Sequence, residues 1–436
     1  MNTHSDSPVV IGTHEGVPFT IDPKPRRRHL HVVGQTGAGK STLLANLIAQ
    51  DLAAGRGVGL LDPHGSLAQD ALSHVPSRRA HHVVYFDPAD TERPIGFNVL
   101  DNINPDRHPV AADGVVSAFR HVWPDSWGPR LEYLLTHAIR ALLANPGSTL
   151  LCVPRLFTDD RYRARILANV HDPVLHAFWR NEWDTYDARF RTEATAPILN
   201  KLGKVLADNR LRNIVAQPKS TIDLRRIMDE GRILIVNLAK GPIGEGTSHL
   251  LGALISTALA TAALSRADTP EHQRRPFYLY ADEFQNYASS GFAVILSEAR
   301  KYALALTLGH QYLGQLYDDL RGAVLGNAAS FVAFRVGAED APLLAAHLGL
   351  KPDVDMNGLG YRSTDPVEQL VRLPDFYAIA RTLRDDMPTD ACCLAMLAPP
   401  PSVNRRSQRL IENSRTRFGK PHAVVEEKIA RFLRFN

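Results

Sequence analysis

A glycine-rich segment near the start of the chain has the composition of a phosphate-binding loop. Residues 34–42 read Gly-Gln-Thr-Gly-Ala-Gly-Lys-Ser-Thr and fit the pattern G-x-x-x-x-G-K-[ST]. The glycines allow the backbone to turn successive N–H groups towards phosphate oxygens, Lys40 supplies charge to the β- and γ-phosphates, and the Ser41 hydroxyl ligates Mg²⁺. We therefore predict that this loop binds ATP with Mg²⁺, in preference to a plain glycine-rich turn. The predicted nucleotide ligands are Gly34, Gln35, Thr36, Gly37, Ala38, Gly39, Lys40, Ser41 and Thr42.

A pair of adjacent acids follows an apolar run much later in the chain. Residues 277–281 have the pattern of a buried strand, and Asp282 and Glu283 come directly after it. Beside a phosphate-binding loop, Asp282 is suited to hold Mg²⁺ through its water shell. Glu283 is suited to accept a proton from the attacking water. Acids at a strand end can also be solvated turn residues, but the loop favours the metal-binding and catalytic roles.

Four further side chains are candidates for a part in the reaction. Gln311 follows the apolar run 304–308, where an amide can orient water or sense hydrolysis, or can simply lie on the surface. Arg300 precedes the same run and is either an arginine finger for a neighbouring subunit or a solvated helix end. Arg335 is the second candidate for the finger. Asp62 is suited to position water or metal, but an Asp-Pro turn explains it almost as well.

Apolar runs of strand length alternate with helical patterns over most of the chain, as a doubly wound, mainly parallel sheet requires. Residues 105–223 differ, because they show only helical spacing and contain all four tryptophans. The gap of about 240 residues between Thr42 and Asp282 independently suggests an insertion. We predict an α/β fold with an inserted all-α domain. The strand-like runs are residues 9–21 (a hairpin), 29–33, 57–61, 82–86, 233–236, 277–281, 304–308, 331–334 and 391–397.

These patterns divide the chain into four parts. The expected parts are an N-terminal hairpin with the first part of the ATPase core (1–104), the all-α domain (105–223), the second part of the core (224–398) and a basic C-terminal tail (399–436).

Composition and charge limit the classes of protein to which the chain can belong. Apolar residues make up 44% and charged residues 22%, as in an average globular protein, and three cysteines indicate no disulfide framework. The longest apolar stretch, 250–264, is shorter than a membrane span and is interpreted as a buried helix. These features predict a cytoplasmic protein without a membrane span. Net charge is +4, and residues 404–436 alone carry nine basic and three acidic residues, a tail that either contacts phosphates or is a solvated end.

Together these motifs resemble the HerA/FtsK superfamily of motor ATPases, and most of all the coupling-protein-like ATPases of type IV secretion and conjugative DNA transfer. The resemblance implies a RecA-like P-loop NTPase core, a hexameric ring with a central channel for DNA, and action of Arg300 on the neighbouring subunit's ATP. Membrane-embedded coupling proteins usually begin with transmembrane helices, which are not predicted here. The segments that carry the resemblance are 31–42, 62–65, 127–130, 282–286, 298–302, 310–311 and 334–337.

Three functions are compatible with these residues. The first is an ATP-driven translocase of DNA, most simply double-stranded, that contacts the phosphate backbone without reading sequence and is served by a loading nuclease or a secretion-system partner. The second is a secretion-type ATPase that moves or unfolds protein, which a near-neutral core favours. The third is a nucleotide-switched DNA-binding module with little turnover. The third function is disfavoured by four residues of the types that hydrolysis needs: Lys40, Asp282, Glu283 and Gln311.

Overall fold

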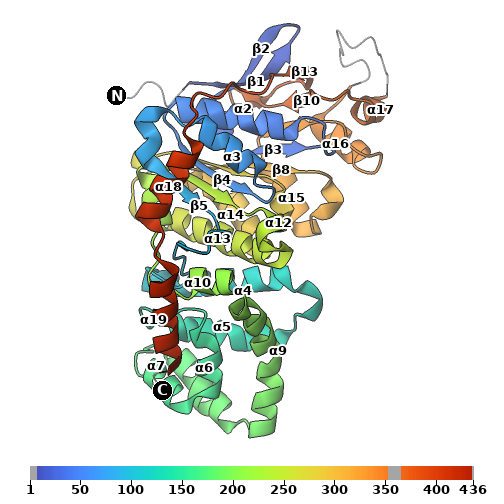
Figure 1. Ribbon diagram of the computed structural model, residues 1–436. Coiled ribbons are helices and arrows are strands. Elements are labelled where there is room, and N and C mark those ends of the chain that lie inside the picture. The colour runs from blue at the N-terminus through green and yellow to red at the C-terminus, as the bar shows by residue number, and fades with distance from the viewer. Residues whose placement is uncertain (1–6, 352–364, 435–436) are drawn as a thin grey trace. The chain divides into compact units, whose positions relative to one another are not determined.

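Two compact units, each assembled from three segments, make up the chain. The computed structural model describes residues 7–351 and 365–434 (Figure 1). The sheet unit comprises Met1–Tyr85, Arg225–Asn237 and Ala262–Asn413, and the helical unit comprises Phe86–Leu224, Leu238–Thr261 and Ser414–Asn436. The helical unit thus takes in more than the expected insertion at 105–223, because it also includes the segments Leu238–Thr261 and Ser414–Asn436.

An eleven-stranded sheet organises the sheet unit, in the order β2-β1-β13-β10-β9-β3-β8-β7-β4-β6-β5. From β9 to β6 the neighbouring strands pair in parallel, whereas β10, β13, β1 and β2 continue the sheet in antiparallel fashion. The strands are β1 (Val9–His14), β2 (Val17–Ile21), β3 (Leu30–Val33), β4 (Gly57–Asp62), β5 (Val83–Phe86), β6 (Ile233–Asn237), β7 (Phe277–Ala281), β8 (Leu304–His310), β9 (Ser330–Ala333), β10 (Tyr377–Arg381) and β13 (Cys392–Met396). A separate hairpin pairs β11 (Leu383–Arg384) with β12 (Met387–Pro388).

Helices bury both faces of the sheet. Successive side chains of a strand point to opposite faces, and Val32 and Val33 accordingly lie in two different hydrophobic clusters. The central parallel strands are almost wholly buried, which explains why they are near-continuous apolar runs in the sequence. The helices of this unit include α1 (Pro23–Arg26), α2 (Lys40–Ala53), α3 (Ser66–Ser73), α11 (Leu224–Asp229), α14 (Ser290–Glu298), α15 (Asp318–Asn327), α16 (Ala341–Leu348) and α17 (Pro366–Val371).

The α/β fold class predicted from the sequence is confirmed, and every expected strand-like run forms a strand. The strand β10 was missed, because only three of its residues, Ala378–Ala380, are buried and two of these are alanines.

Several amphipathic helices pack together in the helical unit. Helix α5 packs against α4, α6 and α9, and its leucines and alanines at helical spacing form the buried face. Trp179 and Trp183 are fully buried and pack edge to face, with ring centroids 5.7 Å apart. The helices that begin and end within this unit include α4 (His108–Val122), α5 (Pro129–Leu143), α6 (Cys152–Thr158), α7 (Asp160–Leu167), α8 (Pro173–Ala177), α9 (Ala188–Ala207), α10 (Asn209–Val215), α12 (Lys240–Ile243) and α19 (His422–Arg434).

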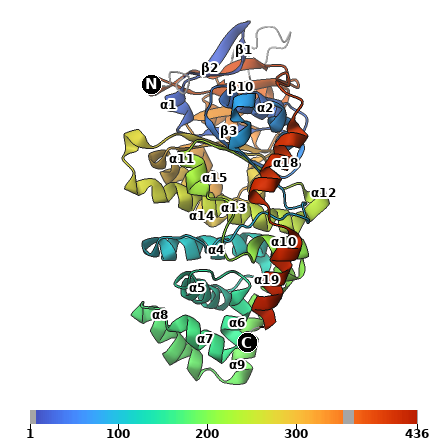
Figure 2. The same cartoon turned by 60° about the vertical axis from the view of Figure 1, so that its left-hand side comes forward.

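The segment expected to be a basic tail is largely helical. It forms α18 (Ser407–Phe418) and α19, and α19 lies beside α10 (Figure 2). Val425 and Ile429 of α19 form a small hydrophobic cluster with Leu151 and Ala216. The apolar face of α19 accounts for this packing, which its net charge conceals in the sequence.

Helix α13 (Glu245–Ser265) contains the apolar stretch that was expected to be too short to span a membrane. With the turn that follows, the helical segment runs from Glu245 to Asp268 and is the one segment among residues 7–351 and 365–434 that is long and apolar enough for a span. Its apolar window is 67% buried in the protein, as the core helix of a folded domain would be. The buried helix expected from the sequence is therefore present, but it extends beyond the apolar run.

Candidate nucleotide site

The phosphate-binding loop connects β3 to α2 at the carboxyl edge of the parallel strands. Gly34, Gly37 and Gly39 all have positive φ angles, which side chains rarely tolerate. A Cβ on Gly34 would lie 2.5 Å from the Cβ of Phe334, so no larger residue fits there. The Gly34 N–H donates to the His310 carbonyl (3.3 Å). This hydrogen bond ties the loop to the end of β8.

Lys40 is buried at the start of α2, with its ammonium inside the loop. Its Nζ donates to the carbonyl oxygens of Gly34 (2.6 Å) and Gln35 (3.1 Å). Burial lowers the pKa of Lys40, while the charges of Glu283 and Asp282 oppose that shift. An ammonium has three donors, so a nucleotide phosphate would accept from the third. The turned backbone and the enclosed cation fit a nucleoside triphosphate.

Asp282 and Glu283 follow β7 and are almost fully buried, with 4% and 6% of their surface exposed. Burial raises the pKa of Asp282 to about 7, helped by the negative charges of Glu283 and Asp62. A divalent cation would favour the ionised carboxylate. Within the part of the chain that the structure describes, no three His, Cys, Asp or Glu side chains gather as a metal site. Because Mg²⁺ usually keeps several waters and takes few protein ligands, Ser41 and Asp282 with phosphate oxygens would be enough to hold it.

The Glu283 carboxylate is held by two amide side chains. Gln311 Nε2 donates to Glu283 Oε1 (3.0 Å), and Gln285 Nε2 donates to Glu283 Oε2 (2.6 Å). The Glu283 backbone has φ 45°, a left-handed conformation that is uncommon outside glycine and that often marks functional positions. The structure thus brings together Lys40, Asp282, Glu283 and Gln311. Gln285 was missed by sequence reasoning, although its spacing of two from Glu283 is a usable signal.

Asp62 has a clear structural role. Its carboxylate is fully buried and accepts the backbone N–H groups of His64 (2.8 Å) and Ala68 (2.8 Å). These bonds close the turn after β4 and join it to the first turn of α3. The turn-forming interpretation is therefore favoured, and the contribution of Asp62 to the site is its charge near Asp282.

The two arginine candidates lie in different places. Arg335 follows β9 and is bonded within its own chain, from Nε to Gln35 Oε1 (3.2 Å) and from Nη2 to Asp375 Oδ1 (2.7 Å). Arg300 is exposed in the short helical turn Ala299–Tyr302, which precedes β8. It therefore lies at the amino edge of the sheet, and the nucleotide-binding residues of the same chain lie at the carboxyl edge.

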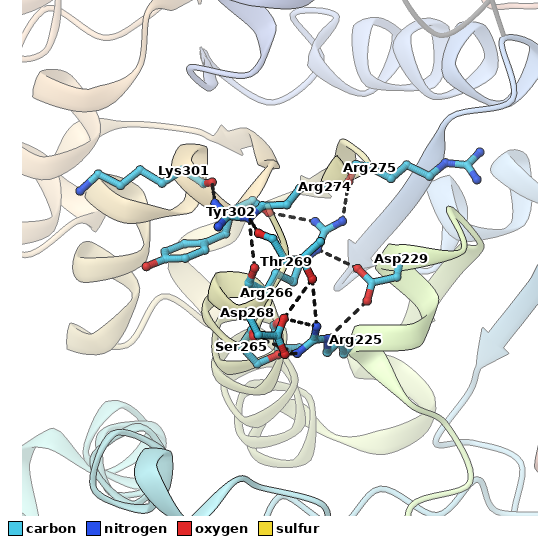
Figure 3. Close-up of polar contacts among 11 residues, drawn as sticks. Arg225, Asp229, Ser265, Arg266, Asp268, Thr269, Arg274, Arg275, Lys301 and Tyr302 are labelled. Atoms are coloured by element: carbon cyan, nitrogen blue, oxygen red, sulfur yellow. Dashed lines mark hydrogen bonds and ion pairs between the residues drawn. The ribbon is translucent and has the colours of Figure 1, made fainter. Parts of the chain in front are cut away.

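An arginine network supports the turn that carries Arg300 (Figure 3). The buried guanidinium of Arg266 donates to the carbonyl of Tyr302 (2.9 Å) and pairs with Asp229 (2.8 Å). Arg274 donates to the carbonyl of Lys301. The backbone of the two residues that follow Arg300 is thus held in place, and this fixes the position from which the Arg300 side chain extends.

Comparisons with known proteins agree with this geometry. Residues 9–109 match the family described as the central domain of helicase HerA. The conjugative coupling protein TrwBΔN70 superposes with a TM-score of 0.64 at 18% identity, covering 93% of this chain and 92% of that one. TrwB in complex with ADP and Mg²⁺ gives a TM-score of 0.62 at 18% identity, with 93% of each chain covered. VirB4 of Thermoanaerobacter pseudethanolicus gives 0.57 at 14% identity, covering 90% of this chain and 97% of that one.

The chain has the fold of the conjugative coupling protein TrwB. The resemblance to the HerA/FtsK superfamily that was drawn from the sequence motifs is confirmed. Identities below 20% establish the fold and leave the activity to be argued from the site. No curated protein sequence matches the chain.

Proposed function

We propose that this chain is an ATP-hydrolysing ring motor that translocates DNA. The observation that carries the proposal is the convergence of Lys40, Asp282, Glu283 and Gln311 at one edge of the sheet, in the fold of a coupling protein. TrwB has been crystallised with non-hydrolysable analogues of ATP and GTP, which supports nucleotide use in this fold.

The chain's own residues suggest how hydrolysis would proceed. The loop amides and Lys40 bind the phosphates and neutralise charge that develops in the transition state. Mg²⁺, when bound, would supply further charge neutralisation on the phosphate oxygens. Glu283, held by Gln285 and Gln311, accepts a proton from the attacking water. Gln311 contacts Glu283 directly. A movement of Glu283 on loss of the γ-phosphate would therefore shift Gln311 at the end of β8.

We further propose that the motor is a cytoplasmic hexamer that holds double-stranded DNA in its channel. Arg300 lies at the amino edge of the sheet, so as an arginine finger it would act on the nucleotide of a second subunit. This supports a ring. A loading nuclease or a secretion-system partner would deliver the DNA. Contacts to phosphates would make binding sensitive to salt.

A motor that moves protein is the second candidate. The likeness to VirB4 and the near-neutral charge outside the C-terminal segment favour it. A nucleotide-switched module with little turnover is disfavoured, because Glu283 is placed and supported as a catalytic base.

Steady-state ATP hydrolysis of the full chain tests the proposal, alone and with double-stranded or single-stranded DNA. We expect DNA to stimulate turnover, and Glu283→Gln to reduce it by about 10²–10⁴-fold while ATP still binds. The exposed Glu271→Gln is the matched control and should behave as the unchanged protein. Turnover that ignores DNA would support the protein-moving alternative, and unchanged turnover in Glu283→Gln would support the switched module.

A further inference from the structure

Phe376 occupies an unusual position beside the phosphate-binding loop. It immediately precedes β10, which runs antiparallel to β9, so Phe376 lies at the same edge of the sheet as the ends of β3 and β9. Its N–H donates to the Ala38 carbonyl (2.9 Å), and its own carbonyl accepts the N–H of Met396 (2.8 Å). The backbone of Phe376 is thereby held against the loop from one side and against β13 from the other.

Two properties distinguish Phe376 from an ordinary apolar residue of the sheet unit. Its φ is 63°, a left-handed conformation that is a genuine outlier for a bulky residue. The residue is nevertheless 49% exposed, so full burial of the ring does not offset that strain. The ring lies close to Gly39, since a Cβ on Gly39 would come 3.2 Å from the Phe376 Cδ1 atom. Strained residues in such positions are often ligand contacts.

The strand order shows which part of a nucleotide would reach Phe376. The γ-phosphate end is defined by Glu283 after β7 and Gln311 after β8, and β8 pairs with one side of β3. On the other side of β3 lie β9 and then β10. In a bound nucleotide, the γ-phosphate would face Glu283 and the other phosphates would follow the loop. The nucleotide would then extend away from β8, towards β9 and β10. Its base leaves the loop on the side where Phe376 is exposed.

We propose that the aromatic ring of Phe376 is the platform on which the purine base of the bound nucleotide stacks. The inference rests on the proposed nucleotide site and adds a residue that contacts the base. An aromatic face offers dispersion and quadrupole contact to any base. Stacking of this kind makes no hydrogen bond to the edge of the base and so does not distinguish adenine from guanine. ATP and GTP should therefore bind with similar affinity.

Calorimetric titration of full-length Glu283→Gln protein, which should bind without turnover, tests the platform. The probes are ATP, GTP and inorganic tripolyphosphate, which has the phosphates but no base. The informative second substitution is Phe376→Gly, because glycine adopts φ 63° without strain and so preserves the backbone. Phe376→Tyr keeps an aromatic face and is the matched control.

We expect Phe376→Gly to raise the Kd for ATP and GTP by at least about fivefold, the lower end of the range for one stacked base. The Kd for tripolyphosphate should stay unchanged, and Phe376→Tyr should bind all three probes as the parent protein does. Equal binding of ATP by the Gly and parent proteins would overturn the platform. A parallel loss of ATP and tripolyphosphate would also overturn it, by showing that Phe376 only shapes the loop. If the parent protein binds none of the three probes, the proposed nucleotide site itself is wrong.

Discussion

At the scale of single residues, the site is defined by how Glu283 is held. Its carboxylate accepts one hydrogen bond from Gln285 and one from Gln311, and its backbone is in the left-handed region. Two amide donors and a constrained backbone leave the carboxylate little freedom to rotate. Gln285 belongs to the same turn as Glu283, whereas Gln311 directly follows β8. Of the two amides, Gln311 is therefore the one that links the Glu283 carboxylate to another strand of the sheet.

We predict that Gln311→Ala lowers the rate of ATP turnover by about 10²-fold and leaves ATP binding within a fewfold of its original strength. The physical reason is that the Glu283 carboxylate loses the donor that orients it, while Lys40 and the loop amides are untouched. Single-turnover rates and nucleotide titrations measure the two quantities separately. Gln408→Ala, on the exposed face of α18, is the control. A large loss of ATP affinity would show instead that Gln311 holds the loop.

At the scale of elements, the parallel strands bring the site together at their carboxyl ends. Val33 pairs with His310 and Ala281 with Leu308, so the residues that follow β3, β7 and β8 emerge side by side. The same alignment puts the residues that precede these strands at the opposite edge. His29, just before β3, and Arg300, before β8, lie there, close enough for the Arg300 charge to affect His29.

His29 provides a prediction for the dependence of stability on pH. Its Nδ1 accepts the N–H of Leu306 (3.1 Å) and its Nε2 donates to the Leu296 carbonyl (3.1 Å), so the buried ring is held neutral. Burial lowers the pKa of His29 to about 4 from an ordinary value of 6.5. The unfolded chain therefore binds a proton that the folded chain does not. The stabilisation is complete above about pH 6.5 and declines as pH falls towards 4, by about 3 kcal/mol in total.

Denaturant unfolding between pH 7.5 and 4.5 measures this effect. His29→Asn, which tolerates the left-handed backbone at this position, should lower stability at pH 7.5 and flatten its decline below pH 6.5. The exposed His272→Asn should leave the profile unchanged. An unaltered slope in His29→Asn would mean that other groups govern acid unfolding of the sheet unit.

The elements also show what a sequence can and cannot predict here. The loop at Lys40 and the strand before Asp282 follow from local patterns, because a phosphate nest and a buried parallel strand each constrain consecutive residues. The position of Phe376 does not, since it depends on a strand of mixed composition pairing with β9. The packing of α19 was missed for a different reason: its seven apolar residues alternate with five charged ones, and the basic charge of residues 404–436 led to the interpretation of the whole segment as a tail.

At the scale of the whole molecule, the position of Arg300 argues for assembly. Strand β8 runs from Leu304 to His310, a rise of about 20 Å at about 3.3 Å per residue. Arg300 precedes the strand and Gln311 follows it, so an arginine side chain cannot span the distance to the γ-phosphate of its own chain. The arginine network formed by Arg266 and Arg274 nevertheless fixes the backbone beside it (Figure 3). A fixed, exposed cation far from its own site is what a finger in trans requires.

Mixing two inactive variants tests whether the site is completed by a neighbouring subunit. Arg300→Ala alone should bind ATP normally and lose about 10³-fold or more in turnover, within the range known for arginine fingers. A ring that contains both Arg300→Ala and Glu283→Gln subunits forms some sites with an intact Glu283 from one subunit and an intact Arg300 from the next. Random mixing in equal amounts makes about a quarter of the sites complete, since each site draws its two residues from different chains.

We therefore expect turnover to return when the variants are mixed, and to rise with total protein concentration. A mixture of Lys40→Ala with Glu283→Gln is the contrast. Both residues act within one chain, and every chain in this mixture lacks one of them, so mixing completes no site. If the first mixture recovers no more turnover than the second, Arg300 does not act across a subunit boundary, and the case for a ring would have to be made from other residues.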